Sequence, residues 1–378
     1  MVDVADVFRR FGPSYQAAHG ALMPPSHRRA IVDILACRTE ALGGHLERCT
    51  ACGAEVHRCH SCRNRSCPKC HGEQTRAWLD KRQAEMLACP YFHVTVTVPE
   101  ELRAALRRHQ RDGYGALMTA AAEAIAELAR DPRHVGGTVG VLAVLHTWTQ
   151  QLHFHPHVHC LVTGGGLGED GDTWHPARPG FLVPIKALAR KVRGRFRAVF
   201  EKRCPGVSLP AAVWRTPWVV HITPWGGGEQ AVLDYLARYV FRIALTDRRI
   251  VGLDDETVSF QYRDRKAGRT RICRVPGHEF LRRYLQHVLP KGFHKVRYFG
   301  LWHPSRRSQA TRVRHALRLD RPIGPPPSPE PQGAPDPQPS PEPGSGTPSL
   351  PPKRPCPRCR TGLLVVIARW TPMRPRAP

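Results

Sequence analysis

The sequence has no long apolar run and no leader-like beginning. None of its apolar stretches approaches the roughly 20 residues that a membrane-spanning helix needs. The first residues, MVDVADVFRRFGPSY, carry early aspartates and lack the apolar core of a signal peptide. We therefore expect neither a membrane span nor secretion, and a membrane is not among the expected partners.

Acidic residues are scarce. Asp and Glu number 31 against 57 Lys and Arg, which gives a formal net charge of +26 over 378 residues. Such an excess excludes an ordinary acidic enzyme and indicates a polyanionic partner. The phosphate-binding pattern G-x-x-x-x-G-K-[ST] is also missing, which argues against an attached ATPase or helicase of that class.

Proline and cysteine are both concentrated in a few places. Of the 37 prolines, 15 fall in residues 321–355, so we expect a linker or tail there. The 13 cysteines include several C-x-x-C pairs, and their total is odd. This pattern suits metal binding in a reducing compartment better than disulfides. We therefore place the protein in a cytoplasm, that of a bacterium.

The hydrophobic periodicity predicts a mixed α+β chain with a central antiparallel sheet. Helical structure is expected over residues 1 to about 40, and further helices are expected near residues 76–87, 100–130, 186–202, 229–245 and 277–289. Strands are expected near residues 91–99, 136–148, 157–166, 218–224, 249–251, 258–263 and 270–275. Within the third of these helices, Gly113 and Gly115 predict a break.

Cysteines near the N-terminus have the spacing of a zinc ligand set. The pattern is Cys49-x2-Cys52-x14-Cys67-x2-Cys70, and two such pairs can close a tetrahedral zinc site. Cys59 and Cys62 are additional candidate ligands. A second pair, Cys356 and Cys359, is half a site that could dimerise, be completed in space or bind nothing.

A histidine-rich strand, QQLHFHPHVHCLVTGGG, is the densest group of reactive side chains. His157 and His159 point to the same face because side chains alternate along a strand. Two neutral imidazoles on a rigid strand can hold a divalent metal that polarises a phosphate. For a third ligand we choose His146, on the preceding strand, over His153 and His155. An isolated cluster could also arise by chance among 21 histidines.

The segment LDYLARYVFR places Tyr235 and Tyr239 one helical turn apart, on one face. Two such tyrosines commonly line a core. The alternative is that they are nucleophiles that attack a phosphodiester and keep the broken bond as a phosphotyrosine, without ATP. Basic residues expected to contact DNA phosphates lie beside them and on the helix over 186–202. They are Arg238, Arg242, Arg190, Lys191, Arg193 and Arg197.

Together these stretches resemble the insertion-sequence-ninety-one family of bacterial transposases, of the HUH endonuclease superfamily. The resemblance rests on SCRNRSCPKC, LHTWTQQLHFHPHVHCLVTGGG, YLARYVFR and EFLRRYLQHVLPKGFHKVRYFGLW, in unbroken order from about Cys49 to Trp302. It implies an N-terminal zinc-binding domain with structural Zn²⁺. It also implies that His157 and His159 hold catalytic Mg²⁺ or Mn²⁺, and that Tyr235 and Tyr239 are the nucleophiles.

The resemblance also implies a division of the chain and a reaction. We expect a helical and zinc-binding domain over residues 1–90 and an HUH-type catalytic domain with an antiparallel sheet over 91–305. Composition, and not the resemblance, predicts that residues 306–378 are a basic and then Pro-rich disordered tail with a terminal C-x-x-C pair. The expected activity is rolling-circle-type transposition through 5′-phosphotyrosine intermediates. The expected partner is single-stranded DNA at the element ends and the target, in the nucleoid, with a homo-oligomer left open.

Two other readings share parts of this evidence. A zinc-dependent DNA-binding regulator without catalysis explains the charge and the cysteines, but leaves the histidine strand and the paired tyrosines without a role. A plasmid relaxase or replication initiator would use the same chemistry, and the cysteine module before the histidine strand favours the transposase.

Overall fold

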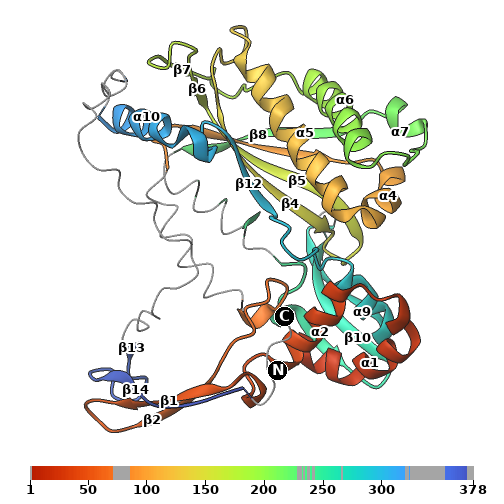
Figure 1. Ribbon diagram of the computed structural model, residues 1–378, viewed down its shortest axis with the longest axis vertical. Coiled ribbons are helices and arrows are strands. Elements are labelled where there is room, and N and C mark those ends of the chain that lie inside the picture. Colours follow the sequence, from red (N-terminus) through yellow and green to blue (C-terminus); the bar gives the residue numbers. More distant parts are fainter. Residues whose placement is uncertain are drawn as a thin grey trace. The chain divides into compact units, whose positions relative to one another are not determined.

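A computed structural model gives the fold of this chain (Figure 1). It describes residues 2–70, 86–227, 232, 235, 239–240, 243–264, 267–319, 323 and 354–372. These residues belong to two compact units. The first contains residues 1–35 and 64–324, and the second contains residues 36–63 and 325–378. Each unit is described by itself below.

A five-stranded antiparallel sheet forms the centre of the first unit. Its strand order is β12-β4-β5-β3-β8. The strands are β3 (Pro90–Thr97), β4 (Gly140–Trp148), β5 (Phe154–Thr163), β8 (Val219–Gly227) and β12 (Val296–Gly300). Their sequences are rich in β-branched residues, as expected for a sheet that is covered on both faces.

Two long helices, α5 (Gln110–Arg130) and α6 (Ile185–Arg203), cover one face of this sheet (Figure 1). The apolar stripe of α6 has the spacing of one helical face and is fully buried. It consists of Leu188, Val192, Phe196 and Phe200. This stripe shares a core with Val141, Ala143 and Leu145, which alternate along β4. The predicted helix over 186–202 is therefore confirmed.

The predicted break at Gly113 and Gly115 is wrong. The helix is interrupted earlier, at His109, between α4 (Arg103–Arg108) and α5, and it runs through both glycines. A Cβ on Gly113 would lie 2.6 Å from Leu106 Cδ2, and one on Gly115 would lie 2.3 Å from Arg203 Nη1. The glycines permit close packing of the helix against its neighbours and do not end it.

The other face of the sheet carries a second core. Leu142, Val144 and Leu161 alternate with the residues of the first core and pack with Leu301 and Val313. Val313 belongs to α10 (Arg307–Leu319), so this helix contributes to the second face. The sheet thus separates two cores, and each residue's parity along its strand decides which core it joins.

The remaining described elements of the first unit include a three-stranded meander in the order β11-β10-β9. Helix α9 follows this meander and packs against α1, where Phe8 and Tyr284 meet edge to face at 5.5 Å. The meander confirms the three short strands expected between residues 249 and 275. The bounds are α1 (Val4–His19), α2 (Pro25–Ala36), β6 (Gly165–Leu167), β7 (Trp174–Pro176), α7 (Ala212–Arg215), β9 (Ile250–Leu253), β10 (Thr257–Asp264), β11 (Arg269–Pro276) and α9 (Gly277–Leu285).

The second unit is a four-stranded antiparallel sheet built from both ends of the chain, in the order β13-β14-β1-β2. Its strands are β1 (Gly44–Cys49), β2 (Glu55–Cys59), β13 (Arg354–Pro355) and β14 (Leu363–Trp370). In Figure 1 the red β1 and β2 lie beside the blue β13 and β14. Strand β14 pairs with β1 from Gly44 opposite Trp370 to Cys49 opposite Leu364.

The α+β class with antiparallel sheets is confirmed. The units, however, do not follow the predicted boundaries at residues 90 and 305. Within residues 306–378, where a disordered tail is expected, the structure forms α10, β13 and β14, and residues 324–353 lie outside the described residues. No helix in the described part of the chain is long and apolar enough to cross a bilayer.

Truncation of Phe196 tests how much the α6 core stabilises the first unit. Phe196 is completely buried and its ring stacks on Phe200 at 5.3 Å, so Phe196→Ala leaves a cavity that the helix cannot easily close. We expect a loss of about 3–5 kcal/mol in the free energy of unfolding, measured by urea denaturation. The control is Arg190→Ala on the exposed side of the same helix, which we expect to change stability by less than about 0.5 kcal/mol.

Candidate functional site

Three histidines on two adjacent strands converge on one point. His146 on β4 is paired directly with His157 on β5, and His159 follows two residues later on the same face. One ring nitrogen from each of the three lies within 4.8 Å of the others. The structure therefore brings together the two histidines expected from the strand pattern and the third one chosen on the preceding strand.

Hydrogen bonds orient two of these rings. His157 donates through Nδ1 to the carbonyl oxygen of His155 at 2.7 Å, which places its lone pair on Nε2. His159 Nδ1 lies 2.9 Å from His93 Nε2 and 3.2 Å from Thr95 Oγ1. Such partners on the far nitrogen fix the tautomer and direction of a metal-binding imidazole.

His93 was missed by the sequence analysis. It lies on β3, where His93 and Thr95 alternate with the buried Phe92 and Val94. This alternation was a usable signal that His93 faces the polar side of a strand. That His93 lies beside His159 follows only from the pairing of β3 with β5, which sets Thr95 opposite His159.

Tyr239 lies directly against the histidine cluster. Its main-chain oxygen accepts a hydrogen bond from His146 Nε2 at 2.6 Å. The centre of its ring is 4.2 Å from that of His159 and 4.7 Å from that of His93. Tyr239 is only partly buried.

Tyr235 is placed differently from Tyr239. It is completely buried in the second core, with its ring centre 4.9 Å from that of Tyr239. Its hydroxyl has no hydrogen-bond partner among the described residues. Burial, assisted by the neighbouring Cys160 and Tyr239, raises the pKa of Tyr235 well above its usual value of 10. In this arrangement Tyr235 stays protonated and Tyr239 is the more accessible of the two.

The donor set allows a test of which cation fits the histidine cluster. Three imidazole nitrogens suit transition metals, whereas Mg²⁺ prefers oxygen ligands in octahedral geometry. Of the two cations predicted from the sequence, Mn²⁺ is therefore the better match to His146, His157 and His159. A cation held there would stabilise negative charge on a phosphate, as phosphoryl-transfer chemistry requires.

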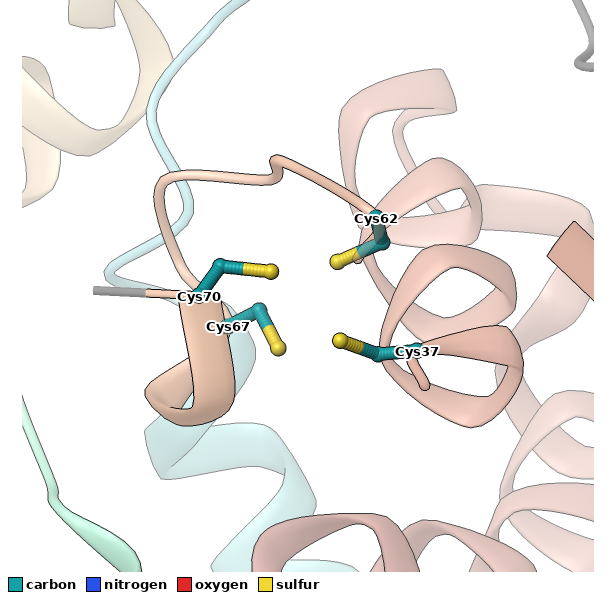
Figure 2. Close-up of side chains that lie close together, drawn as sticks. All are labelled: Cys37, Cys62, Cys67 and Cys70. Atoms are coloured by element: carbon teal, nitrogen blue, oxygen red, sulfur yellow. The ribbon is translucent and has the colours of Figure 1, made fainter. Parts of the chain in front are cut away.

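The cysteines form two clusters instead of the single predicted one. The first contains Cys37, Cys62, Cys67 and Cys70, whose sulfur atoms all lie within 4.8 Å of one another. Figure 2 shows the four thiols pointing toward a common centre. Cys37 follows α2, and Cys67 and Cys70 are joined by a turn in which Cys70 N donates to Cys67 O. Four thiols in this arrangement are a typical structural zinc site.

The second cluster contains Cys49, Cys52, Cys356 and Cys359. The predicted grouping of Cys49 and Cys52 with Cys67 and Cys70 is therefore not what the structure shows. Cys49 and Cys52 lie at the turn of the β1–β2 hairpin, and Cys59 is paired to Gly44 at its base. About 17 Å of strand separate the turn from the base, so Cys62 returns beside Cys37 instead. Cys59 belongs to neither cluster.

The basic residues predicted to contact DNA are distributed unevenly. Those on α6 belong to the helix that covers the sheet face opposite the histidine cluster. Lys191 forms an ion pair with Glu127, and Arg197 forms one with Glu201 at 2.9 Å. Arg193 donates to the Thr216 carbonyl at 3.4 Å, and Arg190 is exposed. Arg238 and Arg242 lie outside the described residues.

Comparison with known proteins gives two family matches. A family model described as "Putative transposase" matches residues 140–310, and one described as "Transposase zinc-binding domain" matches residues 7–98. The chain is 39% identical to "Putative transposase y4qJ" of Sinorhizobium fredii, over 97% of this chain and 94% of that protein. It is 27% identical to the transposase for insertion sequence element IS801 of Pseudomonas savastanoi pv. phaseolicola, over 71% and 68% of the two chains. No solved structure matches.

Zinc content tests the first cysteine cluster. We expect Cys37→Ser to lower the zinc bound per purified chain by one ion, because Cys37 supplies one of four thiolates. Cys59→Ser is the matched control, since Cys59 lies nearby in sequence but outside both clusters. Metal content measured by mass spectrometry checks both variants. Equal zinc in wild type and Cys37→Ser would contradict the assignment.

Proposed function

Because the chain belongs to the insertion-sequence-ninety-one family of transposases, we propose that it cuts and rejoins single-stranded DNA through a covalent tyrosine intermediate. The observation that carries this proposal is the contact between Tyr239 and the three-histidine cluster. Residues 140–310, which match the transposase family model, include all three histidines and both tyrosines. The partner is DNA, in keeping with the net charge of +26.

The proposed reaction assigns a role to each group. The hydroxyl of a tyrosine attacks the phosphorus of a DNA phosphodiester, and the bond to the 3′ oxygen breaks. The 3′ end leaves as a hydroxyl, while the 5′ phosphate stays on the tyrosine. His146, His157 and His159 would hold a divalent cation, which would stabilise negative charge at the phosphate. The bond energy is kept in the phosphotyrosine, so rejoining needs no ATP.

The two tyrosines take different parts in this proposal. Tyr239 makes the first cut, because it is partly exposed and its ring lies beside His159 and His93. Tyr235 is buried and its raised pKa disfavours ionisation, so it does not make the first cut. Its position one turn from Tyr239 suits a second exchange that follows the first without release of the DNA.

The cellular setting follows from these groups. Eight cysteines in two thiol clusters keep their metal-binding form only where disulfides do not accumulate. We therefore propose that the protein acts in a bacterial cytoplasm, at the nucleoid, where its DNA substrate lies. The cysteine cluster within residues 7–98 serves as the structural zinc site of the matched zinc-binding domain.

Covalent capture of DNA tests the role of each tyrosine. Single-stranded DNA from the element's own ends, labelled at its 3′ end, is incubated with protein and Mn²⁺ or Mg²⁺ and separated on a denaturing gel. Wild type and Tyr235→Phe should give a labelled protein band, and Tyr239→Phe should give none.

A 5′-end label is the internal control, because that fragment leaves with its 3′ hydroxyl and cannot label the protein. A band that persists in Tyr239→Phe and disappears in Tyr235→Phe would reverse the assignment. If the wild-type protein binds the DNA but gives no labelled band, the proposed cutting reaction is refuted and the DNA-binding regulator becomes the better explanation.

Metal binding tests the histidine cluster separately. We expect His157→Ala to weaken Mn²⁺ binding by at least about tenfold, as seen by the electron paramagnetic resonance of free Mn²⁺, and to abolish the covalent band. His155→Ala is the matched control, because its ring lies beside the cluster without being part of it. DNA affinity, measured by fluorescence anisotropy, should stay the same in both variants. Unchanged Mn²⁺ binding in His157→Ala would refute the ligand role.

A further inference from the structure

The sulfur atoms of the second cysteine cluster have the spacing of a tetrahedral metal site. Cys49 Sγ lies 3.6 Å from Cys359 Sγ, and Cys52 Sγ lies 3.7 Å from Cys356 Sγ. A tetrahedron with zinc–sulfur bonds of about 2.3 Å has edges of about 3.8 Å. A disulfide bond would place the two sulfur atoms about 2.05 Å apart, so these cysteines are not disulfide-bonded.

The two C-x-x-C turns that supply these sulfurs have the same local conformation. The residue after the second cysteine has a positive φ in each turn, +71° at Gly53 and +60° at Arg360. In each turn this residue's N–H donates to the carbonyl of the first cysteine, at 3.1 Å for Cys49 and 2.9 Å for Cys356. Two unrelated sequence segments therefore adopt one ligand-presenting turn.

Backbone N–H groups point at the sulfurs, as they do around thiolates that bind a metal. Ala51 N and Cys52 N each lie 3.4 Å from Cys49 Sγ, and Gly362 N lies 3.3 Å from Cys359 Sγ. These donors stabilise negative charge on sulfur, which is the form that binds a cation. Both C-x-x-C turns thus provide N–H groups that stabilise a thiolate.

The two turns are also fitted closely to each other. Thr50 N donates to the Leu363 carbonyl at 3.0 Å, and Leu363 N donates to Thr50 Oγ1 at 3.1 Å. A Cβ on Gly362 would lie 2.4 Å from Cys49 Sγ, so only glycine leaves room for the sulfur. The C-terminal turn is therefore shaped around the N-terminal one.

The apolar core beside this site is small. It consists of Cys49, Cys356 and Leu364, with a few partly buried neighbours. A sheet of this size buries too little apolar surface to be stable without a disulfide or a metal. Tetrahedral sulfur ligands without a disulfide indicate zinc, whose binding free energy then stabilises the fold.

We propose that Cys49, Cys52, Cys356 and Cys359 bind a second structural Zn²⁺, so that the C-terminal segment completes a metal domain begun at the N-terminus. The matched zinc-binding domain spans residues 7–98 and contains only two of these four ligands. The proposal is independent of the DNA-cutting chemistry, since none of these residues belongs to the histidine cluster.

Zinc stoichiometry in the full chain tests this proposal. Cys49→Ser and Cys356→Ser should each remove one ion per chain relative to wild type, and the double variant should also remove only one, because both ligate the same ion. Cys273→Ser, a partly exposed cysteine outside both clusters, is the control. Wild-type zinc in Cys356→Ser, or loss of two ions in the double variant, would overturn the proposal.

A second measurement keeps the test valid if a variant folds poorly. A protease site is introduced between residues 330 and 345, and the purified protein is cleaved at low concentration. The C-terminal fragment should stay attached to the remainder on gel filtration and be released by a zinc chelator. The same cleavage in Cys356→Ser should release it without chelator. Retention of the wild-type fragment after chelation has removed all zinc would count against the proposal.

Discussion

The pairing of β4 with β5 is the constraint on which the candidate site depends. It sets His146 opposite His157 and leaves His159 on the same face. A slip of one residue would turn His146 toward α5 and α6 and expose Val141, Ala143 and Leu145 to the site. The apolar core on one face of the sheet therefore holds the register that assembles the three imidazoles on the other. The residues that stabilise the sheet and the three histidines therefore lie on opposite faces of the same two strands.

The same alternation explains which parts of the site could be predicted. His157 and His159 follow from strand periodicity alone, and His146 follows from the expectation that neighbouring strands pair antiparallel. His93 could not be assigned, because its contact with His159 depends on β3 lying on the far side of β5. The partner of a strand is decided by the whole sheet, and the local sequence carries little information about it. Tyr235 and Tyr239 are buried to different extents although they lie four residues apart, and the residues that surround each ring are distant in sequence.

The cysteines and two of the glycines also show what residue spacing along the sequence cannot predict. C-x-x-C spacing marks candidate metal ligands, but the sequence does not say which cysteines meet. Cys59 and Cys62 have this spacing, yet only Cys62 joins a cluster. Grouping Cys49 and Cys52 with Cys67 and Cys70 fails because the first two lie at the turn of a β-hairpin, away from its base. Gly113 and Gly115 predict a break from sequence alone, whereas in the structure they allow a continuous helix to pack closely against Leu106 and Arg203. In both cases the deciding contact is made by residues distant in sequence.

The pairing of β1 with β14 fixes an order of events during synthesis of the chain. Cys52 meets Cys356 across a separation of 304 residues. At about 5–20 residues per second, β1 and β2 wait for roughly 15 to 60 s before their partner strand leaves the ribosome. Through that interval the hairpin has an open edge and two unmatched thiols. The second unit can form only after residues 354–370 have been translated, so a product terminated before them lacks this unit.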